Sequence, residues 1–79
     1  MTTFQVTASS RWDALELMDS LLPYQPYLVQ KAQAVWEVHA HGEPDDLFEL
    51  RVRDALRRRS LDHVEVRLDD GSSLVVRMR

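Results

Sequence analysis

The spacing of apolar residues changes several times along this chain, and the order of those changes restricts the fold more than any single motif does. Apolar and polar residues alternate in Thr3 to Ala8, His63 to Leu68 and Ser73 to Arg79, which predicts three strands with one buried face each. Two other segments repeat apolar residues at helical spacing, one between Ser10 and Pro23 and one that residues 42–46 open and that carries the apolar stripe Leu47, Phe48, Val52, Ala55 and Leu56. The chain therefore combines at least three strands with two helices.

Both expected helices have sequence signals at their ends. Ser10, with Asp13 three residues later, resembles a capping box, and Pro23 stops the first helix. Pro44 and the acids beside it suit the start of the second helix. The arginines 57–59 suit its last turn, because cations complement the helix dipole there.

The segment from Tyr27 to Ala40 is too long for one straight strand. It would extend about 46 Å at roughly 3.3 Å per residue, whereas a chain of this size has a radius of gyration of about 12 Å. We therefore expect a hairpin that is broken at the polar stretch from Gln30 to Gln33. In its second arm, Trp36, Val38 and Ala40 face inward.

These elements predict one α+β domain over residues 1–79, with the order β-α-β-β-α-β-β. Two right-handed split β-α-β crossovers give a ferredoxin-like two-layer sandwich, in which both helices cover one face of an antiparallel sheet with strand order 5-4-1-3-2. We expect the other face to be polar and covered by solvent or a polar partner. Its side chains are those of Thr3, Gln5, Thr7, Glu37, His39, Glu65, Arg67, Val75 and Arg77.

The inward-facing positions of each element define the expected core. The residues expected to be most buried are Trp36, Val38, Phe4, Val6, Leu15, Met18, Phe48, Val52, Val64 and Val66. The first helix is expected to bury a stripe of Ala14, Leu15, Met18, Leu21 and Leu22, with Asp13, Glu16 and Asp19 outside it. Trp12 lies on the flank of that stripe, where we expect it to be partly buried. The alternative is an exposed Trp12 that anchors an interface.

The absence of cysteine excludes several kinds of chemistry. The chain forms no disulfide and offers no thiolate nucleophile or thiolate metal ligand, which is compatible with a reducing cytosol. Residues 1–6 lack the basic and apolar regions of a secretory signal, and no apolar run approaches the ~20 residues that span a bilayer. We therefore expect a soluble, cytoplasmic protein without membrane contact.

The net charge of −3 conceals an asymmetry along the chain. Residues 1–50 carry two basic and eight acidic residues, a charge of −6, whereas residues 51–79 carry eight basic and five acidic residues, a charge of +3. A small chain also has a limited core of its own. We therefore expect a homo-oligomer or a protein partner, through edge pairing of the final strand or across the open sheet face. The alternative is a monomer in which Arg77 and Arg79 protect the edge.

Two histidines lie near three acids, a combination that suits zinc. His39 and His41 precede Glu43, Asp45 and Asp46. The spacing is loose, and two of the acids suit a helix start. We therefore expect surface histidines and no bound metal.

Two further clusters are weak candidates for binding charged groups. Ser9, Ser10 and Arg11 before the first helix form a candidate anion site, although simple capping by serine is the interpretation that we favour. The arginines of the second helix are candidate nucleic-acid contacts, namely Arg51, Arg57, Arg58 and Arg59. Acids interrupt this helix and the whole chain is acidic, so we expect a solvated helix face and no nucleic-acid partner.

No set of nucleophile, base and orienting residue is evident in the sequence. The six serines fall at expected caps, helix ends or turns, and none has a signature that pairs it with a histidine. Gly42 and Gly71 are the only glycines, so no glycine-rich phosphate loop exists. We expect no catalytic residue, no cofactor and no enzymatic activity.

The expected element order is similar to that of the ferredoxin-like superfamilies. Among them, ACT domains often bind ligands at a dimer interface, whereas RNA-recognition motifs place aromatic residues where this chain has Gln5 and Glu37. Acylphosphatases and metal chaperones need a glycine-rich loop or a Cys-x-x-Cys motif, and both are absent. A fold does not carry function by itself. We expect a self-associating interaction or regulatory module, with an ACT-like ligand sensor and a weak nucleic-acid binder as the alternatives. A ligand sensor should show a concave site at the subunit interface or beside the start of the first helix.

Overall fold

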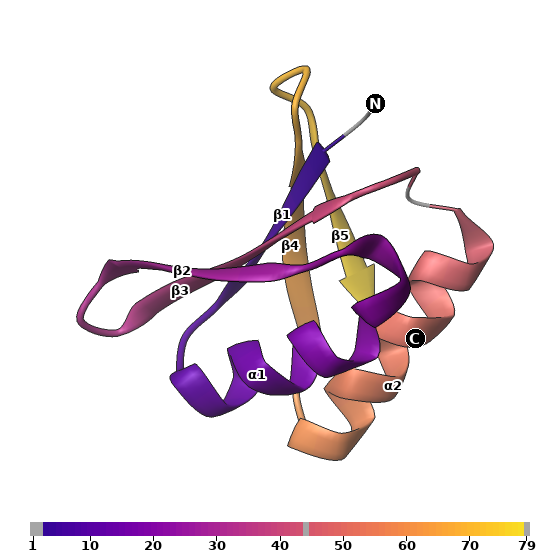
Figure 1. The fold of residues 1–79 in the computed structure, drawn as a ribbon. Helices are drawn as coiled ribbons and strands as arrows, with labels where there is room; N and C mark the ends of the chain where they lie inside the picture. The colour runs from indigo at the N-terminus through magenta and orange to yellow at the C-terminus, as the bar shows by residue number, and fades with distance from the viewer. Residues whose placement is uncertain (1–2, 44, 79) are drawn as a thin grey trace.

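A computed structural model describes residues 3–43 and 45–78 as a small α+β fold of five strands, two helices and one 3₁₀ turn. The elements in chain order are β1 (Thr3–Ala8), α1 (Arg11–Ser20), η1 (Leu22–Tyr24), β2 (Tyr27–Ala32), β3 (Val35–His41), α2 (Asp46–Arg59), β4 (His63–Leu68) and β5 (Ser73–Arg77). Figure 1 shows that the two helices pack side by side beneath the sheet.

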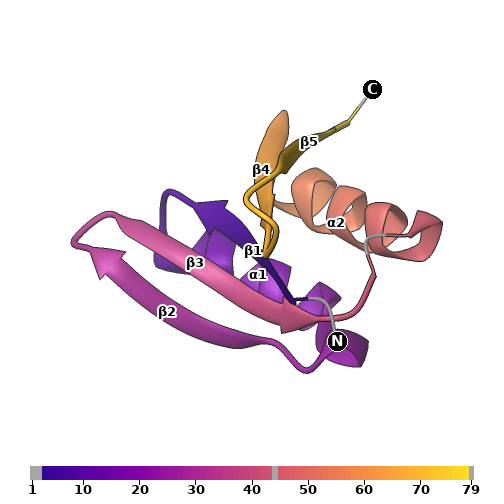
Figure 2. The same cartoon turned by 90° about the horizontal axis from the view of Figure 1, so that it is seen from above.

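All neighbouring strands are antiparallel, and the sheet has the order β2-β3-β1-β4-β5. Read from the other edge, the order is β5-β4-β1-β3-β2. β1 occupies the centre, where Val6 lies between Val38 of β3 and Val66 of β4. Figure 2 shows the strong twist that carries β4 and β5 away from the direction of the β2–β3 hairpin.

The alternating segments form strands as the sequence predicts. Thr3–Ala8 and His63–Leu68 are strands with the expected bounds, and the last strand ends at Arg77. Arg79, the expected end of that strand, lies outside the described residues. In the β4–β5 turn, the Asp70 carboxylate accepts hydrogen bonds from the hydroxyl and from the backbone N–H of Ser72, and these lower the pKa of that carboxyl.

The β2–β3 hairpin is present, but its turn is not where we expected it. β2 continues to Ala32, so Gln33 and Ala34 form the turn instead of the stretch from Gln30 to Gln33. A register shift between Gln30 and Ala32 admits the extra residue of β2. The polar side chains of this stretch are tolerated within a strand because the strand lies at the exposed edge of the sheet.

Both helices begin with a side-chain cap. Ser10 Oγ accepts a hydrogen bond from the Asp13 backbone N–H at 3.1 Å, which confirms the expected N-cap. Asp45 Oδ1 caps α2 by accepting a hydrogen bond from the Phe48 backbone N–H at 2.9 Å. Pro44, expected at the start of this helix, lies outside the described residues. α2 ends at Arg59 and is followed by the C-cap residue Ser60, whose φ of 56° is in the left-handed region.

The core lies between the helices and one face of the sheet. Its fully buried side chains include those of Phe4, Phe48, Leu17, Leu21, Leu56, Val6, Val38, Val52 and Val66. Phe4 packs edge-to-face on Phe48, with ring centroids 4.6 Å apart, and on Tyr24 of η1, with centroids 5.9 Å apart. Of the ten residues expected to be most buried, seven are buried in this core.

The other three, Trp36, Leu15 and Met18, are only partly buried. Trp36 lies opposite Ala8 and Gln30, close to the tip of a hairpin that projects beyond the helices (Figure 1), so no helix covers it fully. In the first helix, rotation about the axis buries Leu17 in place of Leu15.

Three further expectations for the first helix are also wrong. Leu22 is 60% exposed because it belongs to η1, beyond the end of α1. Trp12 is 70% exposed because it lies on the outer side of α1. Asp13, expected to lie outside the stripe, is only 7% exposed because α2 packs against that side.

Candidate functional site

The sheet has a notch where β1 separates from β4. Pairing between these strands ends at Val6 and Val66, whereas β1 continues to Ala8 along β3. The chain then bends at Ser9 and Ser10 to enter α1. Figure 1 shows β1 turning away from β4 above the start of α1, so the two strands diverge towards this end of the sheet.

A cavity of about 350 Å³ lies in this notch. It is bounded by the end of β1, the first turn of α1, the hairpin tip at Ala34 and Val35, and the start of β4. Leu61, Val64 and Val75 add apolar surface. This volume lies at the lower end of the range for small-ligand sites, which is about 300–1,000 Å³.

Three charged or titratable side chains on the open sheet face also border the cavity. Glu65 and His63 come from β4, and Arg77 of β5 is the cross-strand partner of His63. All three residues are exposed. Within the described residues, their side chains form no hydrogen bond or ion pair with another part of the chain. The cavity therefore presents groups of both charge signs that are free to contact a ligand.

A fourth charged group, Asp13, borders the cavity from the first turn of α1. Its Oδ1 accepts a hydrogen bond from Arg59 Nε at 2.8 Å, and its backbone N–H is held by the Ser10 cap. The ion pair compensates for the burial of the carboxylate. Asp13 thus forms a fixed part of the cavity wall.

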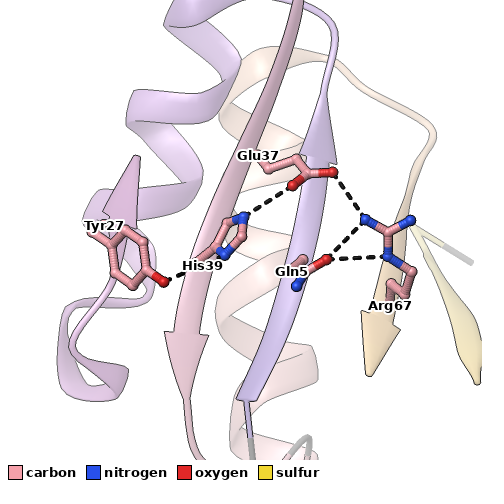
Figure 3. A network of polar contacts seen from close by, with 5 residues as sticks. All are labelled: Gln5, Tyr27, Glu37, His39 and Arg67. Atoms are coloured by element: carbon pink, nitrogen blue, oxygen red, sulfur yellow. Dashed lines mark hydrogen bonds and ion pairs between the residues drawn. The ribbon is translucent and has the colours of Figure 1, made fainter. Parts of the chain in front are cut away.

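A polar network covers the open face beside the cavity (Figure 3). Its centre is Glu37, which is only 6% exposed although it lies on the polar face. Glu37 Oε1 contacts His39 Nε2 at 2.9 Å, and Oε2 accepts a hydrogen bond from Arg67 Nη2 at 3.2 Å. Glu37 is also the cross-strand partner of Thr7, a residue of the cavity wall, so network and cavity adjoin.

The outer members of the network extend it across four strands. Arg67 donates from Nε and Nη2 to Gln5 Oε1, at 3.1 and 2.8 Å. On the other side, the Tyr27 hydroxyl lies 3.5 Å from His39 Nδ1, and the two rings are 5.2 Å apart. Glu37 and Gln5 both accept hydrogen bonds from the Arg67 guanidinium. The network therefore holds these three side chains in place beside the cavity.

The structure separates the three residues of the expected anion site. Ser9 borders the cavity, whereas Ser10 is occupied as the cap of α1. Arg11 is exposed and does not border the cavity. The cation at the cavity is instead Arg77, which is 66 positions from Arg11 in the sequence.

The arginines of α2 are largely paired with acids of the same chain. Arg57 pairs with Asp54 at 3.1 Å, Arg58 with Glu16 at 2.7 Å, and Arg59 with Asp13. Arg51 Nε is buried and has no hydrogen-bond partner among the described residues. The expected nucleic-acid contacts therefore serve, in part, to join α2 to α1.

The two histidines considered for a metal are used differently. His39 belongs to the network, and the ring of His41 lies 6.5 Å from that of Tyr27. Asp45 caps α2 and accepts a hydrogen bond from the Tyr24 hydroxyl at 3.3 Å. Within residues 3–43 and 45–78, no three His, Asp or Glu side chains are grouped as a metal site would require.

Sequence reasoning missed the two residues that organise this region, Asp13 and Glu37. The spacing of apolar residues predicts that both side chains face away from the core. Both are nevertheless buried, and each pairs with an arginine from the second half of the chain. The cap motif at Ser10 did locate Asp13, but nothing in the local sequence indicates Arg59 or Arg67 as the partners.

Comparisons of this chain with protein-family models, with curated proteins and with solved structures find no match. Both helices in the described part of the chain fall short of the length and apolarity that crossing a membrane requires. The functional proposal therefore depends on the geometry of the chain itself.

Proposed function

We propose that this protein is a non-enzymatic regulatory module that binds a small ligand in the cavity between β1 and β4. We also propose a ferredoxin-like fold, because a βαββαβ order with both helices on one face is supplemented only by the added strand β5. The cavity lies beside the start of α1, where a ligand sensor would have its concave site.

The observation that carries this proposal is the composition of the cavity wall. Apolar surface from Val35, Val64 and Val75 adjoins groups of both charge signs, Glu65 and Arg77, that have no side-chain partner within residues 3–43 and 45–78. Such a combination of apolar walls with a few directed polar groups is typical of small-molecule sites. Elsewhere, the charged groups of the network and of the α1–α2 contact are satisfied by one another.

A catalytic role is less well supported by the network. The network contains a hydroxyl, an imidazole and a carboxylate in a row, from Tyr27, His39 and Glu37. In nucleophilic catalysis, such a row supplies the nucleophile, the general base and the group that orients the base. Glu37 is shared with Arg67, however, and the Tyr27 hydroxyl lies at the 3.5 Å limit of hydrogen bonding. We therefore assign the network a structural role in holding the rim of the cavity.

Nuclear magnetic resonance titration tests the proposal with named probes: free amino acids, dicarboxylic acids and nucleotides. We expect at least one class to shift the backbone signals of Thr7, Val64 and Val75 in a saturable way. Ala34→Trp should fill the cavity and abolish binding, whereas Gln33→Trp, the neighbouring turn position outside the cavity, should leave it unchanged. Shifts confined to other surfaces, or no saturable binding by any class, would contradict the proposal.

A second proposal, self-association through β5, rests on the free edge of that strand. Met78 N donates to Asp62 O at 3.0 Å and Leu68 N to Ser72 O at 2.8 Å, so the even-numbered residues bond to β4. The backbone groups of Ser73, Val75 and Arg77 therefore point outward.

An antiparallel second copy centred on Val75 would place these outward backbone groups in register. It would also bring the two Val75 side chains, each 45% exposed, into contact. Arg53 Nε already donates to the Arg77 carbonyl oxygen at 2.9 Å and so covers one end of the edge. The free pairing surface is therefore limited to residues 73–75 and the Arg77 N–H.

A further inference from the structure

We propose that the ligand of the cavity is the carboxyl-terminal end of an extended peptide. This inference rests on the proposed function and names the class of ligand. Two features of the notch support it: strand backbone and a guanidinium beside it, both without a partner among the residues that the structure describes.

The first feature is the edge of β4 at His63. The Asp62 carbonyl oxygen bonds to Met78 on the β5 side, so the backbone groups of the next residue, His63, point towards β1. β1 pairs with β4 only as far as Val66, and His63 therefore faces the notch. Its N–H and C=O are placed to pair with one residue of an extended chain, as in strand addition.

The second feature is Arg77. It is the cross-strand neighbour of His63, it borders the cavity, and its guanidinium has no partner among the described residues. A guanidinium binds a carboxylate with two parallel hydrogen bonds. A chain end that pairs with His63 would thus carry its terminal carboxylate next to Arg77.

The rest of the cavity fits the neighbouring groups of such a chain end. Val35 and Leu61 offer apolar contact for one side chain, and the Glu65 carboxylate accepts from a peptide N–H. A volume of about 350 Å³ accommodates only a few residues, so recognition would be confined to the end of the peptide. A free carboxylic acid shares the chemistry at Arg77 but lacks the backbone groups.

Fluorescence anisotropy with a pooled library of labelled tripeptides tests the inference. One pool has free carboxyl termini, the second is amidated, and the third is N-methylated at the last peptide bond. We expect the free-acid pool to bind about tenfold or more tightly than the amidated pool, because a charged hydrogen-bonded pair is lost on amidation. N-methylation should also weaken binding, because it removes the donor to the His63 carbonyl.

Arg77→Gln should remove the difference between the free-acid and amidated pools. Arg57→Gln is the matched control, because Arg57 is exposed and lies outside the cavity. Equal binding of the two pools to the natural protein would overturn the inference, as would competition by acetate or succinate as effective as that of a whole peptide. If small molecules bind but no peptide does, the peptide inference is overturned and the proposed function is retained. If nothing binds, both the peptide inference and the proposed function are overturned.

Discussion

Arg59 Nε donates to Asp13 Oδ1 across 2.8 Å, and this ion pair joins the last turn of α2 to the first turn of α1. Two more pairs, Arg58 with Glu16 and Arg67 with Glu37, likewise connect the basic second part of the chain to the acidic first part. The opposite charges that we expected to attract two copies to each other are thus partly neutralised within one molecule. Self-association would depend more on apolar and backbone contacts.

Arg59→Gln should lower the free energy of unfolding by about 1–2 kcal/mol, because it leaves the buried Asp13 carboxylate without its charged partner. Urea denaturation followed by circular dichroism measures this. Arg57→Gln is the control, since its pair with Asp54 is exposed and should contribute at most about 0.5 kcal/mol. Equal effects of the two substitutions would show that the helix-to-helix pair has no special role.

Glu37→Gln should destabilise the protein by about 1–2 kcal/mol, since Arg67 and His39 both lose a charged partner. Glu65→Gln removes a carboxylate on the same face that has no partner in the described part of the chain, and this variant should change the free energy of unfolding by at most about 0.5 kcal/mol. Denaturant titrations of the two variants compare them directly. A Glu37 variant as stable as the Glu65 variant would contradict a structural role for the network.

Phe4→Ala should cost about 3–5 kcal/mol, because Phe4 is fully buried between Phe48 and Tyr24. That is a large share of the roughly 4–12 kcal/mol expected for a chain of this size. Where this variant fails to fold, Phe4→Leu gives a smaller measurable loss. Trp12→Ala, at a position 70% exposed, should change stability little, and a comparable loss there would show that Trp12 packs against something in solution.

Stability at alkaline pH should depend on Tyr24. Burial raises the pKa of its phenol above the ordinary value, and the Asp45 carboxylate, which accepts its hydrogen bond, adds to this. The pKa of Tyr24 is therefore higher in the folded protein than in the unfolded chain. The protonated phenol stabilises the folded state fully below pH about 10, and this stabilisation is lost as the pH rises through the folded pKa. Above pH about 10, the natural protein should therefore lose stability more steeply than Tyr24→Phe. Parallel slopes in pH-dependent denaturation would refute this.

Self-association through β5 should appear in sedimentation equilibrium at tens of micromolar protein as a species heavier than the 9.2 kDa chain. Val75→Pro should abolish it, because proline removes an outward N–H and the apolar contact at the centre of the pairing. Gln30→Pro, in the opposite edge strand, is the comparison, because the backbone N–H of Gln30 likewise points outward. A single 9.2 kDa species in both low and high salt would rule the dimer out.

The alternation and helical spacing of apolar residues determined most of the local structure. The bounds of β1 and β4, the cap at Ser10 and the existence of a hairpin within residues 27–40 all follow from interactions between residues close in sequence. The position of the hairpin turn did not follow, because an exposed edge strand tolerates polar residues such as Gln30 and Lys31. The local sequence therefore does not mark where that strand ends.

Only the tertiary structure decided which polar residues are buried and where a site exists. Asp13 and Glu37 occupy outward positions by periodicity, yet arginines 46 and 30 positions away cover them. The cavity arises because β1 leaves β4 at Val66 to enter α1, which brings Ser9 and Arg77 to the same space. Contacts of this kind join distant parts of the chain, and a local pattern of apolar residues contains no information about them.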